Sequence, residues 1–143
     1  NASRTDVTFS SSNTKYATVN SNGVVTTKKA GAGKTVTITI SATDSSKLKV
    51  NYSFKIEPIK VTKVTLTAST TTVKVGKTAK ITAKILPTNA TNKNVKWKVS
   101  NTKYASISSK GILTAKKAGK TVKVTATAKD GSKKYGTINI KIK

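Results

Sequence analysis

The chain has 143 residues with 28 basic and four acidic side chains, which gives a formal net charge of +24 at pH 7. It contains no histidine and no cysteine, so the commonest general base, the thiolate nucleophile, disulfide bonds and the usual zinc ligands are all excluded. No apolar run reaches membrane-spanning length, and we therefore expect no membrane insertion.

Apolar residues alternate with Thr, Ser or Lys through residues 1–57, and this is the period of half-buried β-strands. Asn22-Gly23 is a favoured hairpin turn, because both positions tolerate positive φ. The expected strand residues, in chain order, are Val7, Phe9, Ala17, Val19, Val24, Val25, Val36, Ile38, Ile40, Val50, Tyr52, Phe54 and Ile56.

The same alternation continues through residues 58–143, and no helical pattern interrupts it. Pro87 should end one strand because proline cannot donate to a β-ladder. About seven short strands with turn signals between them predict a two-sheet antiparallel sandwich. The expected strand residues are Val64, Leu66, Val73, Val75, Ala79, Ile81, Ala83, Ile85, Val95, Trp97, Val99, Ala105, Ile107, Ile112, Leu113, Val122, Val124, Ala126, Ala128, Ile138, Ile140 and Ile142.

The two segments are versions of one sequence. NTKYATV at 13–19 recurs as NTKYASI at 101–107, and NGVVTTKKAG at 22–31 aligns with KGILTAKKAG at 110–119. In the same alignment Phe9 matches Trp97. A repeat of this length predicts two tandem domains, at 1–57 and 58–143.

The second copy has an opening stretch, 58–88, that the first copy lacks, because Asn1 aligns with Asn89. We therefore expect residues 1–57 to be the C-terminal part of a sandwich without its opening strands, in a chain cut from a longer polypeptide. Such a sandwich leaves an apolar face and open sheet edges. We expect the lacking strands to come from another chain or from a cleaved upstream segment held noncovalently.

The second segment resembles the bacterial immunoglobulin-like domain, group 2, in stretches that agree in order, such as 75–78, 86–93, 95–100, 110–115, 118–119 and 125–132. Residues 1–57 resemble a shortened copy, with Phe9 in place of the tryptophan and Ala32-Gly33 inserted. The resemblance implies tandem immunoglobulin-like β-sandwiches of a bacterial cell-surface or secreted protein. Such domains act as stalks, spacers or adhesion domains, or as accessory modules of secreted enzymes, and carry no catalytic residues.

The carboxylates form no pair or cluster in the sequence; they are Asp6, Asp44, Glu57 and Asp130. Glycoside hydrolysis needs two facing carboxylates, and calcium needs several together. We therefore expect no catalytic site, no metal site and no cofactor.

Residues 58–143 hold 20 lysines against one aspartate. Strand parity places four lysines outward on strands expected to be neighbours: Lys96, Lys98, Lys123 and Lys141. One hypothesis is a basic face that binds anionic cell-wall polymer, acidic glycan or nucleic acid. The alternative is a solvated face whose repelling lysines discourage edge aggregation. Specific nucleic-acid recognition is disfavoured, because the chain has one arginine and few aromatic residues.

Overall fold

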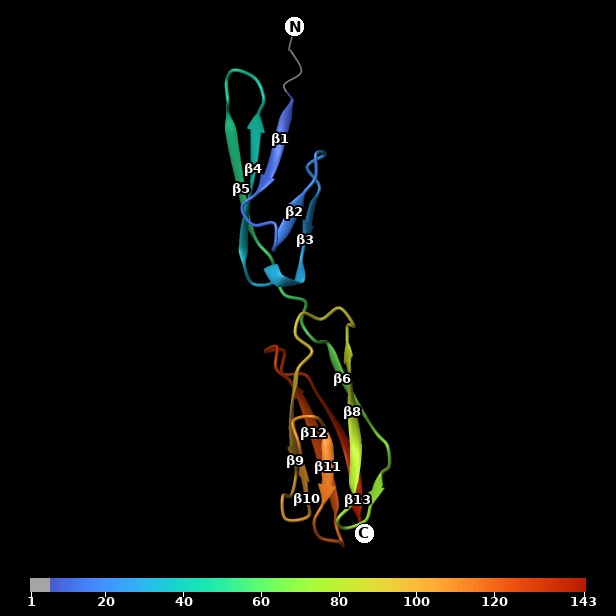
Figure 1. The fold of residues 1–143 in the computed structure, drawn as a ribbon. Helices are drawn as coiled ribbons and strands as arrows, with labels where there is room; N and C mark the ends of the chain where they lie inside the picture. Colours follow the sequence, from blue (N-terminus) through green and yellow to red (C-terminus); the bar gives the residue numbers. More distant parts are fainter. Residues whose placement is uncertain (1–5) are drawn as a thin grey trace. The chain divides into compact units, whose positions relative to one another are not determined.

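The computed structural model describes residues 6–143, and these residues form β-strands joined by turns, with one short 3₁₀ turn, η1 (Lys29–Gly31). The all-β class expected from the alternation is confirmed. The chain divides into two compact units, residues 1–58 (unit 1) and residues 59–143 (unit 2), which are drawn in Figure 1. The described residues include no helix long and apolar enough to cross a bilayer.

Unit 2 is built from two four-stranded sheets, with strand orders β10-β11-β8-β6 and β7-β13-β12-β9. The sheet strands alternate inward apolar and outward polar residues, which is the pattern of a sandwich with one buried face per sheet. The strands are β6 (Lys63–Ala68), β7 (Thr72–Val73), β8 (Thr78–Leu86), β9 (Val95–Val99), β10 (Ala105–Ile107), β11 (Ile112–Ala115), β12 (Thr121–Ala128) and β13 (Tyr135–Ile142).

The two inner faces of unit 2 meet in one continuous apolar core. β12 and β13 supply its centre, where Val122, Val124 and Ile140 have no exposed surface. Branched side chains at alternate positions suit a pleated surface and lose little freedom when buried there. Trp97 packs against this core while remaining half-exposed. β8 ends at Leu86, just before Pro87, as the sequence predicted.

One strand pair of unit 2 departs from the antiparallel expectation. β7 pairs in parallel with β13, so the chain leaves the sheet of β6 and joins the opposite sheet. The prediction of Val75 as a strand residue was wrong, because β7 ends at Val73 and Val75 is 48% exposed in the following turn. Only residues 74–77 separate β7 from β8, which returns to the first sheet, and a turn there is required.

Unit 1 contains a three-stranded sheet of order β1-β4-β5 and a separate two-stranded sheet of β2 and β3. Figure 1 shows β1, β4 and β5 side by side, with the β2–β3 pair next to β1. Its small buried core consists of Ala17, Val36, Ile38 and Ile56. The strands are β1 (Val7–Ser11), β2 (Ala17–Val19), β3 (Val25–Thr27), β4 (Thr35–Ala42) and β5 (Lys49–Lys55).

The strand register of unit 1 repeats that of unit 2. Phe9 pairs with Ile40 where Trp97 pairs with Ala126. β1, β4 and β5 thus correspond to β9, β12 and β13, and the β2–β3 pair corresponds to β10–β11. The described residues of unit 1 contain no counterpart of β6, β7 or β8.

The prediction of Val24 and Ile56 as strand residues was wrong, because Val24 precedes β3 and is 58% exposed, and Ile56 follows the end of β5. Two expected residues of β5 are also largely exposed: Val50 (63%) and Tyr52 (66%). Both lie on β5 with the parity of Phe54, which packs against the small core. Alternation placed them on the apolar side of the strand, but among residues 6–58 no strand covers that part of the sheet.

Candidate functional site

The four lysines singled out in the sequence lie on a single sheet face of unit 2. They come from three neighbouring strands, β9, β12 and β13. Their neighbours along the strands, such as Trp97 and Val122, contribute to the core instead, because side chains alternate across a strand. We call the following four exposed residues the lysine face: Lys96, Lys98, Lys123 and Lys141.

The register of this sheet arranges three of the lysines along a diagonal. Lys98 pairs with Thr125, which lies two residues from Lys123 on β12. Lys123 in turn pairs with Asn139, two residues from Lys141 on β13. Diagonal neighbours on adjacent strands are separated by roughly 7–8 Å, which is within reach of one extended polyanion.

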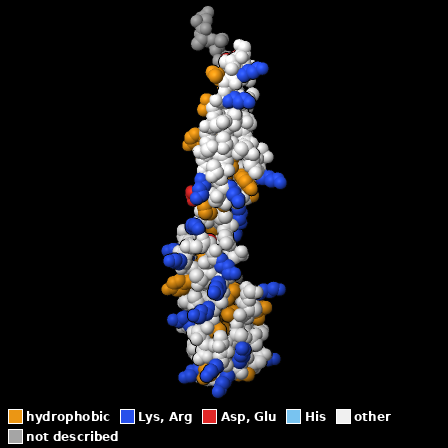
Figure 2. Space-filling view, turned by 90° about the vertical axis from the view of Figure 1, so that its left-hand side faces the viewer, with side chains coloured by type: hydrophobic (Ala, Val, Ile, Leu, Met, Phe, Trp, Pro, Cys, Tyr) orange, Lys and Arg blue, Asp and Glu red, His pale blue; other side chains and the backbone are white. Residues whose placement is uncertain are grey.

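No carboxylate offsets the charge of the lysine face. The single acid of unit 2, Asp130, lies in the turn between β12 and β13. The one ion pair found among residues 6–143 joins Lys55 and Glu57 in unit 1, at 3.7 Å. In the view of Figure 2, basic side chains are spread over the part of the surface formed by unit 2. A face of this kind has a positive potential that attracts anions.

Asp130 connects the start of unit 2 to the β12–β13 turn through hydrogen bonds. Its Oδ2 accepts a hydrogen bond from Val61 N at 2.5 Å, and its Oδ1 accepts one from Ser132 N at 2.9 Å. Lys60 Nζ donates to the backbone oxygen of Asp130 at 2.5 Å. Burial acts to raise the pKa of this carboxyl, but hydrogen bonds from Ser132 and Val61, together with the charge of Lys60, lower the pKa to about 2.

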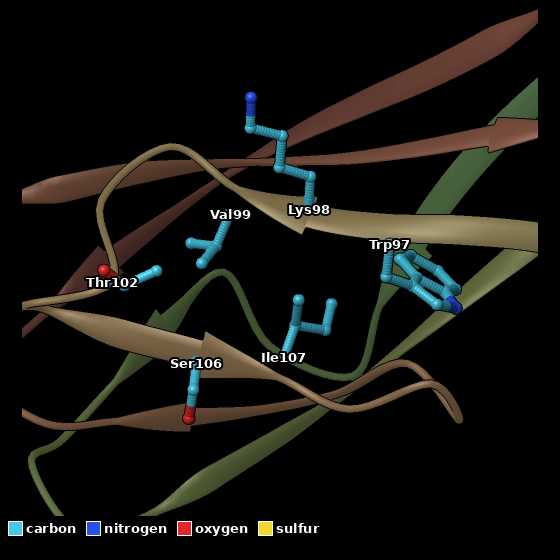
Figure 3. Close-up of a pocket in the computed structure, with 6 residues that line it drawn as sticks. All are labelled: Trp97, Lys98, Val99, Thr102, Ser106 and Ile107. Carbon is cyan, nitrogen blue, oxygen red and sulfur yellow. The ribbon is translucent and has the colours of Figure 1, made fainter.

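A shallow pocket opens between β9 and β10, which are each the end strand of their sheet. Its volume is about 310 Å³. Figure 3 shows the Val99 and Ile107 side chains pointing toward each other between the strands, while Lys98 points away. No carboxylate, imidazole or thiol belongs to the lining, which consists of Trp97, Lys98, Val99, Thr102, Ser106 and Ile107. The pocket can hold a small apolar group but offers no general base.

Sequence reasoning missed both the pocket and the contact made by Asp130. The pocket forms only because two end strands from different sheets face each other. The bond from Asp130 to Val61 spans 69 residues and leaves no local pattern in the sequence.

The remaining carboxylates lie outside the strands, and Asp6 comes near Asp44 because the backbone oxygen of Asp6 accepts a hydrogen bond from Thr43 N at 3.0 Å. Asp44 and Asp130 occupy equivalent turns of the two units, Asp6 precedes β1, and Glu57 follows β5. Within residues 6–143 no three acidic, histidine or cysteine side chains gather in a way that could hold a metal ion.

A comparison with protein families matches residues 60–138 to the family described as "Bacterial Ig-like domain (group 2)". No curated protein matches the sequence significantly.

Several solved structures are similar to the chain. The S-layer protein rSbsC(31-844) has 18% identity and a TM-score of 0.47, with 96% of this chain and 20% of that chain covered. A C-terminal fragment of intimin, solved in complex with the intimin-binding domain of its translocated receptor, has 16% identity and a TM-score of 0.46, with 96% and 51% covered. Murine CEACAM1b has 22% identity and a TM-score of 0.44, with 89% and 68% covered. The chain thus spans a fifth of the S-layer chain and about half of the intimin fragment.

Proposed function

Because the chain belongs to the bacterial Ig-like domain (group 2) family, we propose that it is a non-catalytic module of a bacterial surface or secreted protein. In this proposal it works outside the cell as a stalk, spacer or adhesion domain. The continuous core of unit 2 supports a mechanical role. The inward residues of its strands pack against one another, and the outward residues are mainly Lys, Thr and Ser.

The observation that carries the proposal is the parallel pairing of β7 with β13. β7 lies near the start of unit 2 and β13 ends it, so tension between the two ends of the unit pulls these strands in opposite directions. Backbone hydrogen bonds resist this shear, from Lys141 N to Thr71 O (2.8 Å), from Lys143 N to Val73 O (2.9 Å) and from Val75 N to Lys143 O (2.8 Å). Hydrogen bonds loaded in shear must break at the same time, so a larger force is needed to separate the strands. Resistance to force is what a stalk requires.

Single-molecule pulling on the whole chain tests the mechanical role. Unit 2 should unfold in one event that lengthens the tether by roughly 250–300 Å, the extended length of its residues. Val75→Pro removes the N–H that donates to Lys143 O and should lower the unfolding force. Val75→Ala keeps this donor and serves as the control. Equal unfolding forces for the two variants would contradict the mechanical role.

A second candidate function is an accessory binding module that attaches a secreted enzyme to anionic cell-wall polymer or glycan. The lysine face favours this function, because its four cations share one sheet face with no acid among them. Binding of this kind should persist at physiological salt, where the Debye length is about 8 Å, if the lysines contact the polymer directly.

The binding function is tested by replacing all four residues of the lysine face with glutamine and measuring binding to teichoic acid and to DNA. Teichoic acid binding at about 0.15 M salt should be lost, and the salt dependence should weaken by about one unit of slope per contact removed. A control with the same charge change on the opposite side of unit 2 should keep its binding: glutamine at Lys63, Lys80 and Lys84 on β6 and β8, and at Lys110 in the β10–β11 turn. Equal losses in the two variants would indicate only a diffuse charge effect.

In this proposal, the uncovered side of unit 1 binds a partner. We infer that unit 1 is completed by β-strands from another chain or from a cleaved upstream segment held noncovalently. The contrast between Val25 on β3, 36% exposed, and its counterpart Leu113 on β11, 0% exposed, supports this inference. The amide of Thr27 on β3, whose counterpart Ala115 N donates to Lys77 O in unit 2, should therefore exchange rapidly in the chain alone. Slow exchange of this amide would contradict the inference.

A further inference from the structure

The uncovered side of unit 1 is an apolar surface with a defined shape. Val50, Tyr52 and Phe54 follow one another along one side of β5, and the rings of Tyr52 and Phe54 have centroids 6.2 Å apart. Val7 on β1 and Val25 on β3 are also exposed. In Figure 2, apolar side chains are visible at the surface of unit 1. We call Val7, Val25, Val50, Tyr52 and Phe54 the open face of unit 1.

Unit 2 shows what covers the matching surface in the same repeat. β6 packs across β13, the counterpart of β5, and buries Val64 and Leu66 there. β8 extends the sheet of β11, the counterpart of β3, and buries Ala79 and Ile81. The covering element is therefore two strands that present small and branched apolar residues at alternate positions.

The edge of β3 offers the hydrogen-bonding groups that β11 uses. In unit 2, Ala115 N donates to Lys77 O at 3.0 Å, and Ile81 N donates to Gly111 O at 2.8 Å. The counterparts of Ala115 and Gly111 are Thr27 and Gly23. No such bond to a strand beside β3 is found among residues 6–58. An incoming strand would satisfy these groups by β-augmentation.

The carboxylate of Asp44 lies at the end of the open face, in the β4–β5 turn. Asp44 begins the β4–β5 turn as Asp130 begins the β12–β13 turn, and both accept a hydrogen bond through Oδ1 from the backbone N–H two residues on. Asp130 Oδ2 also receives Val61 N, two residues before β6. Asp44 Oδ2 has no partner in the part of unit 1 that the structure describes.

From these matches we propose that the open face of unit 1 binds a pair of β-strands of the same repeat type as residues 63–86, in the register of β6 and β8. Asp44 binds the backbone N–H at the entry of the first strand, and β3 pairs with the second. This assignment rests on the proposed completion of unit 1 by added strands, and it specifies their chemistry and register.

Val50 should make the open face discriminate between strands that follow the path of β6 and strands that do not. Gly136 on β13 is buried, and a Cβ there would lie 2.5 Å from Val64 O of β6. Its counterpart on β5 is Val50, since Gly136 pairs with Ala126 as Val50 pairs with Ile40. A strand that follows the path of β6 would collide with the Val50 side chain. The native first strand must therefore bow away from β5 at this point, and residues 59–88 of this chain fit imperfectly.

A labelled peptide of residues 59–88, added to the whole chain, tests the proposal by fluorescence anisotropy. Val50→Gly should tighten binding by about tenfold, because it removes an overpacked contact. Asp44→Asn should weaken binding by about fivefold, because a neutral acceptor makes the weaker hydrogen bond. Asn51→Gly, on the outward side of β5, controls for the effect of glycine on the strand and should leave affinity unchanged. Amide shifts should map to β3 and β5.

The results of this experiment distinguish the completion of unit 1 by added strands from the register in which those strands bind. Failure of the peptide to bind both the wild-type chain and Val50→Gly would overturn the completion of unit 1 as well as the register. Binding in unit 1 with equal affinity for the wild-type, Val50→Gly and Asp44→Asn chains would leave the completion standing and overturn the register. Amide shifts confined to residues 59–143 would show strand exchange in unit 2 and would also overturn the register.

Discussion

Gly136→Ala should destabilise unit 2, although alanine normally improves a strand. Gly136 lies on β13 with ordinary backbone geometry, so its conformation does not require glycine. What requires glycine is space: an added Cβ would lie 2.5 Å from the oxygen and 3.0 Å from the carbon of the Val64 carbonyl. Because these are backbone atoms of β6, the strand itself must move.

The size of the effect follows from two opposing contributions. Replacing a strand glycine by alanine stabilises by about 0.5–1 kcal/mol through the unfolded chain. Overpacking a well-filled core costs about 1–3 kcal/mol. Displacing β6 also disturbs Val64, which is buried against the core. We therefore expect a net loss of about 1–2 kcal/mol, and a larger loss for Gly136→Val, which copies Val50.

Urea unfolding followed by tryptophan fluorescence measures this loss in unit 2 alone, because Trp97 is the single tryptophan of the chain. For a small domain the midpoint should fall by about 1 M. Thr137→Ala, on the outward side of the same strand, is the control and should shift the midpoint little. A midpoint for Gly136→Ala that is equal to or above that of the wild-type chain would refute the close approach of β6 and β13.

Other predictions follow from burial and charge. Leu113→Ala should lower the free energy of unfolding of unit 2 by about 2–5 kcal/mol, because Leu113 is fully buried. Val25→Ala, at the equivalent but partly exposed site, should lower that of unit 1 by less than about 1 kcal/mol. Hydrogen exchange in each unit measures both changes. The folded pKa of Asp130 is lowered from 3.8 to about 2, so its stabilising contribution is complete above about pH 4 and is lost as pH falls toward 2. Asp130→Asn should remove this part of the acid sensitivity, measured by Trp97 fluorescence in melts between pH 2 and 5. Unchanged acid sensitivity would contradict the role of the bond to Val61.

The sequence predicted the local structure well, because strand alternation is a local property. Parity placed Val122, Val124 and Ile140 in the core and Lys123 and Lys141 on the outward side. The strand end before Pro87 was likewise predictable, since the ability to donate to a β-ladder depends on the residue itself.

Contacts between distant strands were not predictable in the same way. Nothing in the sequence near Val73 indicates that β7 leaves the sheet of β6 and pairs in parallel with β13. The pocket beside Trp97 likewise depends on two end strands facing each other across the sandwich. Val50 and Tyr52 have the pattern of covered residues, yet their exposure depends on which strands lie over β5.

By itself, the sequence determined that this protein is all β and which side of most strands is apolar, because side-chain alternation repeats every two residues within a strand. Only the tertiary structure decided which strands are neighbours, where Asp130 anchors the chain, and why glycine is required at 136 but not at 50. These features depend on approaches of a few ångströms between segments far apart in the chain, and such approaches leave no periodic signal in the sequence.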